Sequence, residues 1–298
     1  MLASLREQNL PRSSWELILV DSASPEPLER HPAIHTFAGV RHVRAPESGL
    51  ALARLLGFAA SRAPRLAFVD DDTVLAQDYL RKGLDFLQAH PRVGAVGGRI
   101  RPEFLAPAPA WISEFGPLLA LRDFGDRTLS AAFPIGGSGP HLYPDFAPIG
   151  PHISDRRHFD RYQRSCRENP ARLKFGRNGV SLASGEDNDY VIGILQEGGE
   201  VAYFPEMEIT HLIPRERLEA SYLARLGYAS SKSWVQVLAM NGISPWPQIA
   251  PWTATPRKLK AWLKIRPWSG PAARIRFANA RGHFDGRVRP RHPAAGSP

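Results

Sequence analysis

Residues 66–80 read LAFVDDDTVLAQDYL, and this stretch decides the fold class. Four apolar residues are followed at once by three acids, which predicts a short buried strand over 66–69 that ends at Asp70, Asp71 and Asp72. The spacing of the leucines that follow predicts a helix over 77–89 with one apolar face. A strand followed by an amphipathic helix is the repeating unit of α/β proteins.

The same alternation continues on both sides of this stretch. Residues 16–20 (ELILV) and 93–96 predict further strands, and residues 48–61 predict a helix that Ser48 would cap. Further along, the pattern predicts a strand over 200–204 and helices over 184–197 and 217–237. The expected fold is therefore α/β, with a Rossmann-like, mainly parallel sheet flanked by helices.

The rest of the chain is expected to be less regular. Residues 102–151 are rich in proline and glycine and predict a long irregular segment of the functional kind. A domain boundary is expected near Asn241, which divides the chain into a domain over 1–240 and a basic, proline-containing extension over 241–298. Within the extension we expect a short basic helix over 255–264 and disorder after Arg289.

Composition excludes several classes of protein. Of 298 residues, 43% are hydrophobic and 22% charged, which excludes wholesale disorder. No apolar run is long enough for a spanning helix, and the charges and amides in residues 1–10 predict no signal peptide. Cys166 is the single cysteine, so an internal disulfide framework and a multi-cysteine zinc site are excluded, and a cytoplasmic location is expected.

The net charge of +9 belongs to the C-terminal extension. Residues 257–298 hold eleven lysines and arginines and one acid, Asp285, so the remainder of the chain is nearly neutral. This distribution argues against a nucleic-acid partner for the whole surface. The basic residues alternate with Trp262, Leu263 and Trp268, a pattern that suits an anionic membrane surface, although a solvated basic extension would show it too.

Acidic residues are the main candidates for chemistry. Three acids at the end of an apolar strand repel one another, and a divalent cation is the simplest compensator, although an acidic turn with solvated carboxylates fits the pattern equally well. If the strand continued, Asp70 and Asp72 would point to one side and Asp71 to the other. Asp21 ends the strand over 16–20, where it could meet a nucleoside or begin a turn of its own loop.

A second group of candidates lies late in the chain. The segment SGEDND contains Glu186 and Asp187, and an acid here could be a general base in a cleft. The alternative is local, because Ser184 and Asp187 have the spacing of a capping box that opens a helix. His211 would be a metal ligand only if the fold brings it to the aspartates.

In this order, these segments resemble the family 2 glycosyltransferases, which have the GT-A fold. The resemblance covers residues 5–225 through ELILVDSAS, LAFVDDDTVLAQDYL, VGAVGGRIRPE, PIG, SGEDNDYVIGILQEGGEVAYFP and THLIPRERL. It implies a role for each matching residue: Asp187 as general base with Glu186 beside it, Asp72 and His211 as metal ligands, and Asp21, Arg54, Asp70 and Asp71 in binding the nucleotide sugar.

The resemblance also implies a reaction. A nucleotide-diphosphate sugar is the donor, Mn²⁺ or Mg²⁺ is the cofactor, and a hydroxyl of a carbohydrate, lipid-linked or other acceptor attacks with inversion of configuration. For such an enzyme we expect a place in the cytoplasm or, through the basic extension, at the inner face of the membrane. A rival hypothesis is a metal-dependent phosphohydrolase that uses the three aspartates.

The chain departs from the family at three places. Met1 lies where the family has its first helix, so the family's first strand is not in this sequence: either the true start lies upstream of Met1, which we favour, or the product is truncated, and without that strand a neighbouring strand is expected to have an unpaired edge. This departure makes a catalytically inactive nucleotide-sugar-binding relative the main alternative to an enzyme. Leu55 and Leu56 replace polar residues, and residues 151–153 (PHI) replace small or amide ones, which affects the expected handling of the acceptor.

Overall fold

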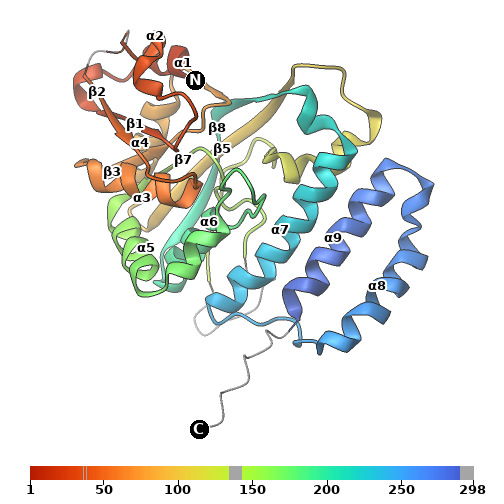
Figure 1. Cartoon of the computed structure of the whole chain (residues 1–298). Coiled ribbons are helices and arrows are strands. Elements are labelled where there is room, and N and C mark those ends of the chain that lie inside the picture. The colour runs from red at the N-terminus through yellow and green to blue at the C-terminus, as the bar shows by residue number, and fades with distance from the viewer. Residues whose placement is uncertain (36, 38, 134–142, 289–298) are drawn as a thin grey trace.

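The computed structural model describes every residue except 36, 38, 134–142 and 289–298 (Figure 1). Its centre is a six-stranded sheet in which β6 pairs with β8 beside a path of five strands. The order along that path is β3 (Arg65–Phe68), β7 (His152–Asp155), β5 (Val93–Phe104), β8 (Glu200–Ile213) and β4 (Thr73–Leu75), and β6 covers Leu129–Ala132.

The directions of the strands make this sheet mixed. β3, β5 and β8, the three that the sequence predicts, run in one direction, as expected for a parallel sheet. The short strands β4, β6 and β7, which the sequence analysis did not identify, run antiparallel to their neighbours. The expected α/β fold is confirmed, with antiparallel strands added to its parallel framework.

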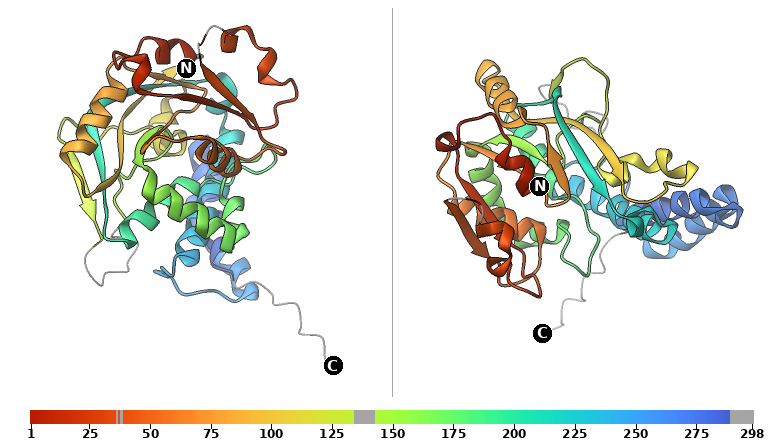
Figure 2. Two further views of the ribbon diagram at one scale, coloured as in Figure 1. Left: turned by 90° about the vertical axis from the view of Figure 1, so that its left-hand side faces the viewer. Right: turned by 90° about the horizontal axis from the view of Figure 1, so that it is seen from above.

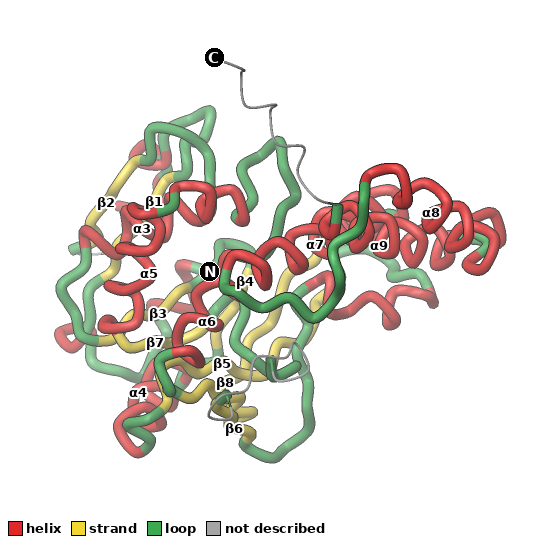
Figure 3. The backbone as a smooth tube through the Cα atoms, turned by 90° about the horizontal axis from the view of Figure 1, so that it is seen from below, coloured by secondary structure: helices red, strands yellow, loops and turns green. Residues whose placement is uncertain are grey.

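Helices cover both faces of the sheet. α4 (Tyr79–Ala89) packs on one face, and α5 (Arg156–Glu168) and α6 (Glu186–Gln196) pack on the other (Figure 3). Neighbouring residues of one strand therefore enter different cores: Val96 packs with Leu80 and Leu87 of α4, whereas Ala95 packs with Phe159 of α5 and Ile194 of α6. This alternation follows from the two-residue period of a strand.

β1 (Leu17–Asp21) and β2 (Val40–Arg44) form a separate parallel pair that packs against α3 (Leu50–Ala60). Among the described residues β1 pairs only with β2, and β3 only with β7. The other edge of each of these two strands has no described partner, so the expectation of an unpaired edge is confirmed. Residues of both strands line one large cavity. Two short helices, α1 (Leu2–Arg6) and α2 (Pro32–His35), accompany this part of the chain.

The C-terminal part is a layer of three helices. Figures 1 and 2 show α7 (Ala220–Met240), α9 (Pro271–Arg287) and α8 (Pro251–Ile265) side by side, with α9 in the middle. α7 ends beside Asn241, where the domain boundary is predicted, and α8 contains the predicted basic helix. α9 was not predicted, and the disorder expected after Arg289 lies outside the described residues.

Two local expectations are corrected. The segment over 102–151 is less irregular than expected, because β5 continues to Phe104 and pairs with β8, and β6 follows. Ser48 does not cap α3, whose N-cap is Gly49. The remaining helical segments are short 3₁₀ turns at Arg12–Ser14, Leu28–Arg30, Ala110–Leu119, Pro170–Phe175, Arg215–Leu218 and Pro267–Ser269.

Candidate active site

A cavity of about 1390 Å³ lies beside the ends of β1 and β3. This volume exceeds the roughly 300–1,000 Å³ that is usual for a small-molecule site. Apolar side chains from the two strand edges line one part of it, and seven of the eight residues that the sequence selects line another. These seven are Arg54, Asp70, Asp71, Asp72, Glu186, Asp187 and His211.

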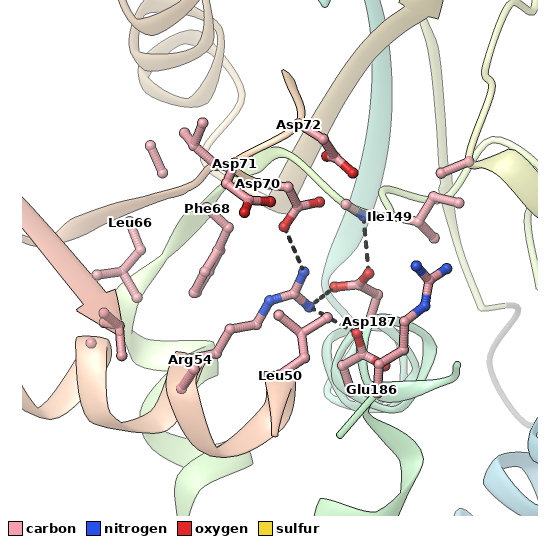
Figure 4. A pocket seen from close by; sticks show the side chains of 18 of the residues that line it. Leu50, Arg54, Leu66, Phe68, Asp70, Asp71, Asp72, Ile149, Glu186 and Asp187 are labelled. Carbon is pink, nitrogen blue, oxygen red and sulfur yellow. Dashed lines mark hydrogen bonds and ion pairs between the residues drawn. The ribbon is translucent and has the colours of Figure 1, made fainter. Parts of the chain in front are cut away.

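Arg54 is the centre of the first group of charges in this cavity. It comes from α3 and points toward three carboxylates from two other parts of the chain (Figure 4). Its guanidinium donates to Asp187 and lies 3.8 Å from Asp70 Oδ1 and 3.6 Å from Glu186 Oε1. The fold thus joins residues 133 positions apart, which no local sequence pattern could show.

The electrostatics of this group follow from its limited contact with water. Loss of solvent raises the pKa of Asp70 to about 6, against the attraction of Arg54. Burial also raises the pKa of Glu186, and the neighbouring charge of Asp187 adds to that shift. The pKa of Arg54 is raised because the attraction of Asp187, Glu186 and Asp70 outweighs its burial. One buried cation therefore holds three acids together.

Asp187 is fixed by contacts to two other segments of the chain. Its Oδ2 accepts a hydrogen bond from the backbone N–H of Gly150 at 2.9 Å, and its Oδ1 accepts from Arg54. The predicted capping box is wrong, because the N-cap of α6 is Gly185 and no side chain caps it. A Cβ at Gly185 would lie 2.9 Å from the side chain of Val237 in α7, so the helix begins where its backbone meets α7 closely.

Asp72 belongs to a second group of charges. Its Oδ2 lies 3.3 Å from His211 Nε2 on β8 and accepts from Arg217 Nη1 at 2.6 Å, and the same Nη1 lies 3.2 Å from His211 Nε2. The other ring nitrogen of His211 is 2.9 Å from the carbonyl oxygen of Leu119, which orients the ring. Although burial acts against it, the hydrogen bond and charge of His211 and the charge of Arg217 lower the pKa of Asp72 to about 2.

These two side chains fit a divalent cation. Cis ligands of an octahedral ion with bonds of about 2.1 Å lie about 3 Å apart, close to the 3.3 Å between Asp72 Oδ2 and His211 Nε2. An oxygen and an imidazole nitrogen also suit Mn²⁺. Within the described residues no cluster of three or more acidic, histidine or cysteine ligands forms, so that part of the chain would supply two ligands.

Asp71 and Asp21 take different places. Asp71 is exposed at the rim of the cavity, because β3 ends at Phe68 and the acids lie on a turn instead of a continuing strand. Asp21 is fully buried, and its carboxylate accepts from Arg44 and from the backbone N–H groups of Ser24 and Leu28. It therefore holds its own loop, and the neighbouring Ser22 and Ser24 line the cavity in its place.

Sequence reasoning missed two elements of the site. Arg217 lies in the segment THLIPRERL, where the sequence analysis assigns no role to this arginine. Its position six residues after His211 could have indicated a contact with the same acids. The backbone N–H of Gly150 could not be found from residue type, since any residue but proline has one. Arginines compensate two of the acids: Arg54 lies beside Asp70, and Arg217 pairs with Asp72.

Comparison with solved structures defines the class of fold. The chain resembles a mannosyltransferase, PcManGT from Pyrobaculum calidifontis, solved with GDP-Man and Mn²⁺, with a TM-score of 0.54, 19% identity, and coverage of 94% of this chain and 68% of that one. It also resembles S. aureus TarS 1-349 in complex with UDP-GlcNAc, with a TM-score of 0.53, 11% identity, and coverage of 96% and 84%. The fold is that of the GT-A glycosyltransferases.

Sequence comparison finds the same class of protein. The family described as "Glycosyl transferase family 2" matches residues 1–132. The succinoglycan biosynthesis protein ExoM of Rhizobium meliloti (strain 1021) is 24% identical over 246 residues, which cover 80% of this chain and 70% of that protein. Both matches support the resemblance to the family 2 glycosyltransferases that the sequence motifs indicated.

Proposed function

We propose that this protein transfers a sugar from a nucleotide-diphosphate sugar to an acceptor hydroxyl, with inversion of configuration. The observation that carries the proposal is the convergence of Asp187, Arg54 and Asp72 on one cavity from three separate segments. Solved structures of similar fold contain GDP-Man with Mn²⁺ in one case and UDP-GlcNAc in another, which supports this class of donor.

Each side chain has a role in one in-line displacement. Asp187 accepts the proton of the acceptor hydroxyl, whose oxygen forms a bond to the anomeric carbon as the bond from that carbon to the diphosphate breaks. The diphosphate leaves with the bonding electrons, so a nucleoside diphosphate and an inverted glycoside result. Glu186 and Arg54 keep Asp187 in position, and Asp70 and Asp71 face the donor. Asp21 acts on the donor by shaping its loop.

A divalent cation, Mn²⁺ or Mg²⁺, would be held by Asp72 and His211. When bound, it neutralises the charge that develops on the leaving diphosphate. The low pKa of Asp72 keeps its carboxylate ionised at neutral pH, as a ligand requires.

The proposal also covers the acceptor and the location of the reaction. The similarity to a succinoglycan biosynthesis protein favours a carbohydrate or lipid-linked acceptor in the synthesis of a polysaccharide. No helix among the described residues is long and apolar enough to cross a membrane. For the location we propose the cytoplasm, with the basic extension as the part that could reach the inner face of the membrane.

Thermal unfolding with a panel of nucleoside diphosphates, with and without Mn²⁺, tests the donor site. At a hundredfold excess over Kd, the matching nucleotide is expected to add about 2.7 kcal/mol of stability and to raise Tm by roughly 5 °C. The part of the shift that needs Mn²⁺ should disappear in Asp72→Asn and persist in Asp78→Asn, whose carboxylate pairs with Lys82 outside the cavity. A protein that melts cooperatively but responds to no nucleotide would contradict the proposal.

Arg217 gives a separate prediction about the metal. Its guanidinium donates to Asp72 Oδ2 at 2.6 Å and lies 3.2 Å from His211 Nε2, so it occupies the position beside the two ligands. Arg217→Gln is expected to raise the affinity of the donor-free protein for Mn²⁺ by about tenfold or more, because a competing cation is removed. The loss of the free Mn²⁺ signal in electron paramagnetic resonance measures this binding. The gain should be absent when Asp72→Asn is added, and equal affinities in Arg217→Gln and the wild type would refute the competition.

A further inference from the structure

The helix α8 carries its apolar side chains on the side turned away from the protein. Trp252, Leu259 and Leu263 are 79%, 57% and 57% exposed. Their positions, i, i+7 and i+11, place them on a single face of the helix. Figure 1 shows α8 as the outermost of the three C-terminal helices, so nothing among the described residues covers this face.

The opposite side of α8 attaches the helix to the protein. Ala254 is buried there, and Lys258 forms an ion pair with Asp285 of α9. A surface helix normally turns its apolar stripe to the core and its polar residues to water. In α8 the arrangement is reversed, because small and charged groups make the contact while the large apolar groups face the solvent.

Two tryptophans extend the exposed face, one in the last turn of α8 and one beyond its end. Trp262 and Trp268 are 40% and 55% exposed, and their ring centroids lie 4.5 Å apart. We call the surface formed by these five side chains the outer face of α8: Trp252, Leu259, Trp262, Leu263 and Trp268. Tryptophan is the side chain that is most enriched where a protein meets the headgroups of a bilayer.

Positive charge surrounds the outer face of α8. Arg257, Lys260, Lys264 and Arg266 are exposed, and residues 251–284 contain no acid. A second copy of the same face would meet its own charge, which disfavours self-association. A leaflet that contains anionic lipid has the complementary charge and accepts the aromatic and aliphatic side chains as well.

We propose that the outer face of α8 docks on the surface of an anionic lipid bilayer. The helix would lie in the plane of the interface, with its apolar side chains among the headgroups and the basic residues beside lipid phosphates. Docking would leave the cavity accessible, since no described residue after Trp234 lines it. This docking specifies how the protein would reach the membrane. Its role in glycosyl transfer rests on the proposed function, whereas the docking itself does not.

Cosedimentation of the full chain with lipid vesicles tests the proposal. The wild type is expected to bind vesicles that contain phosphatidylglycerol, to bind phosphatidylcholine vesicles weakly, and to dissociate as salt is raised. Trp252→Ser with Leu263→Ser should weaken binding by at least about tenfold, because the buried apolar area falls. Lys260→Glu with Lys264→Glu should abolish the preference for anionic vesicles. All four side chains are exposed, so the variants are expected to fold.

The matched control is Leu105→Ser with Val180→Ser, which removes two apolar side chains that are 58% and 97% exposed elsewhere. This control should bind vesicles like the wild type. Binding that survives both α8 variants would overturn the proposal. A second result would also overturn it. In that case light scattering would show a dimer that the Trp252→Ser, Leu263→Ser variant no longer forms, and no form of the protein would bind vesicles. Vesicle binding without nucleotide binding would refute the proposed transferase and leave the docking surface standing.

Discussion

Asp187→Asn is expected to lower kcat by roughly 10²–10⁴-fold, the range typical of removing a general base. The amide has the same size as the carboxylate and can still accept from Gly150 N–H at its oxygen. It cannot accept the proton of an acceptor hydroxyl. The release of nucleoside diphosphate in the presence of acceptor measures the loss, and thermal stabilisation by the donor nucleotide should remain.

Glu186→Gln is the control for this prediction. Glu186 neighbours Asp187, is 5% exposed, and accepts a hydrogen bond from Gly185 N–H at its own helix start. Because it is turned inward, it can position Asp187 but has poor access to an acceptor. Its replacement should cost less activity than that of Asp187. If Asp187→Asn kept more than about a tenth of kcat, another group would have to be the base.

Local patterns sufficed for the elements on which the site depends. The strand before Asp70 and the helix that carries Asp187 both have a strong apolar signal over a short stretch, and the structure places both within one or two residues of the prediction. α5 was missed because its Arg-rich composition hides a stripe of Phe159, Tyr162 and Cys166, all buried. These three positions have the spacing i, i+3 and i+7, which is typical of a helix, so the sequence did contain the signal for α5.

The pairing of charges could not be predicted in the same way. The contacts of Arg54 to Asp187 and of Arg217 to Asp72 join segments more than a hundred residues apart. Short polar strands such as β7, which follows Pro151, have no periodic signal of their own and are formed by pairing with β3 and β5. Asp21 is the clearest example. Its position at the end of a strand was predicted correctly, but its ion pair with Arg44, which keeps its carboxylate out of the cavity, was not.

Arg54→Met is expected to destabilise the fold by about 3–5 kcal/mol, as for other buried ion pairs that lose one partner. Tm should fall by roughly 5–8 °C. Methionine keeps most of the side-chain stem, including its packing near Phe68, over whose ring the guanidinium lies at 5.6 Å. What is lost is the cation, so Asp70, Glu186 and Asp187 are left to repel one another.

The pH dependence separates this cause from a packing defect. In the wild type the folded-state pKa values of Asp70 and Glu186 already lie above their ordinary values, and removal of Arg54 raises them further. A raised carboxylate pKa destabilises the fold above that pKa, and the penalty disappears as the pH falls through it and the acid is protonated. The difference in stability between wild type and variant should therefore be larger at pH 8 than at pH 5.

Arg65→Met is the matched control, because it makes the same substitution in an ion pair nearer the surface. Arg65 lies 2.7 Å from Asp155, and its side chain is 34% exposed. Such a pair contributes about 0–1 kcal/mol, so little change in Tm is expected at either pH. A loss in Arg54→Met that is equally large at both pH values would mean that packing, and not the charge of the guanidinium, makes Arg54 important. In that case the three acids of the site would be held together by their backbone contacts alone.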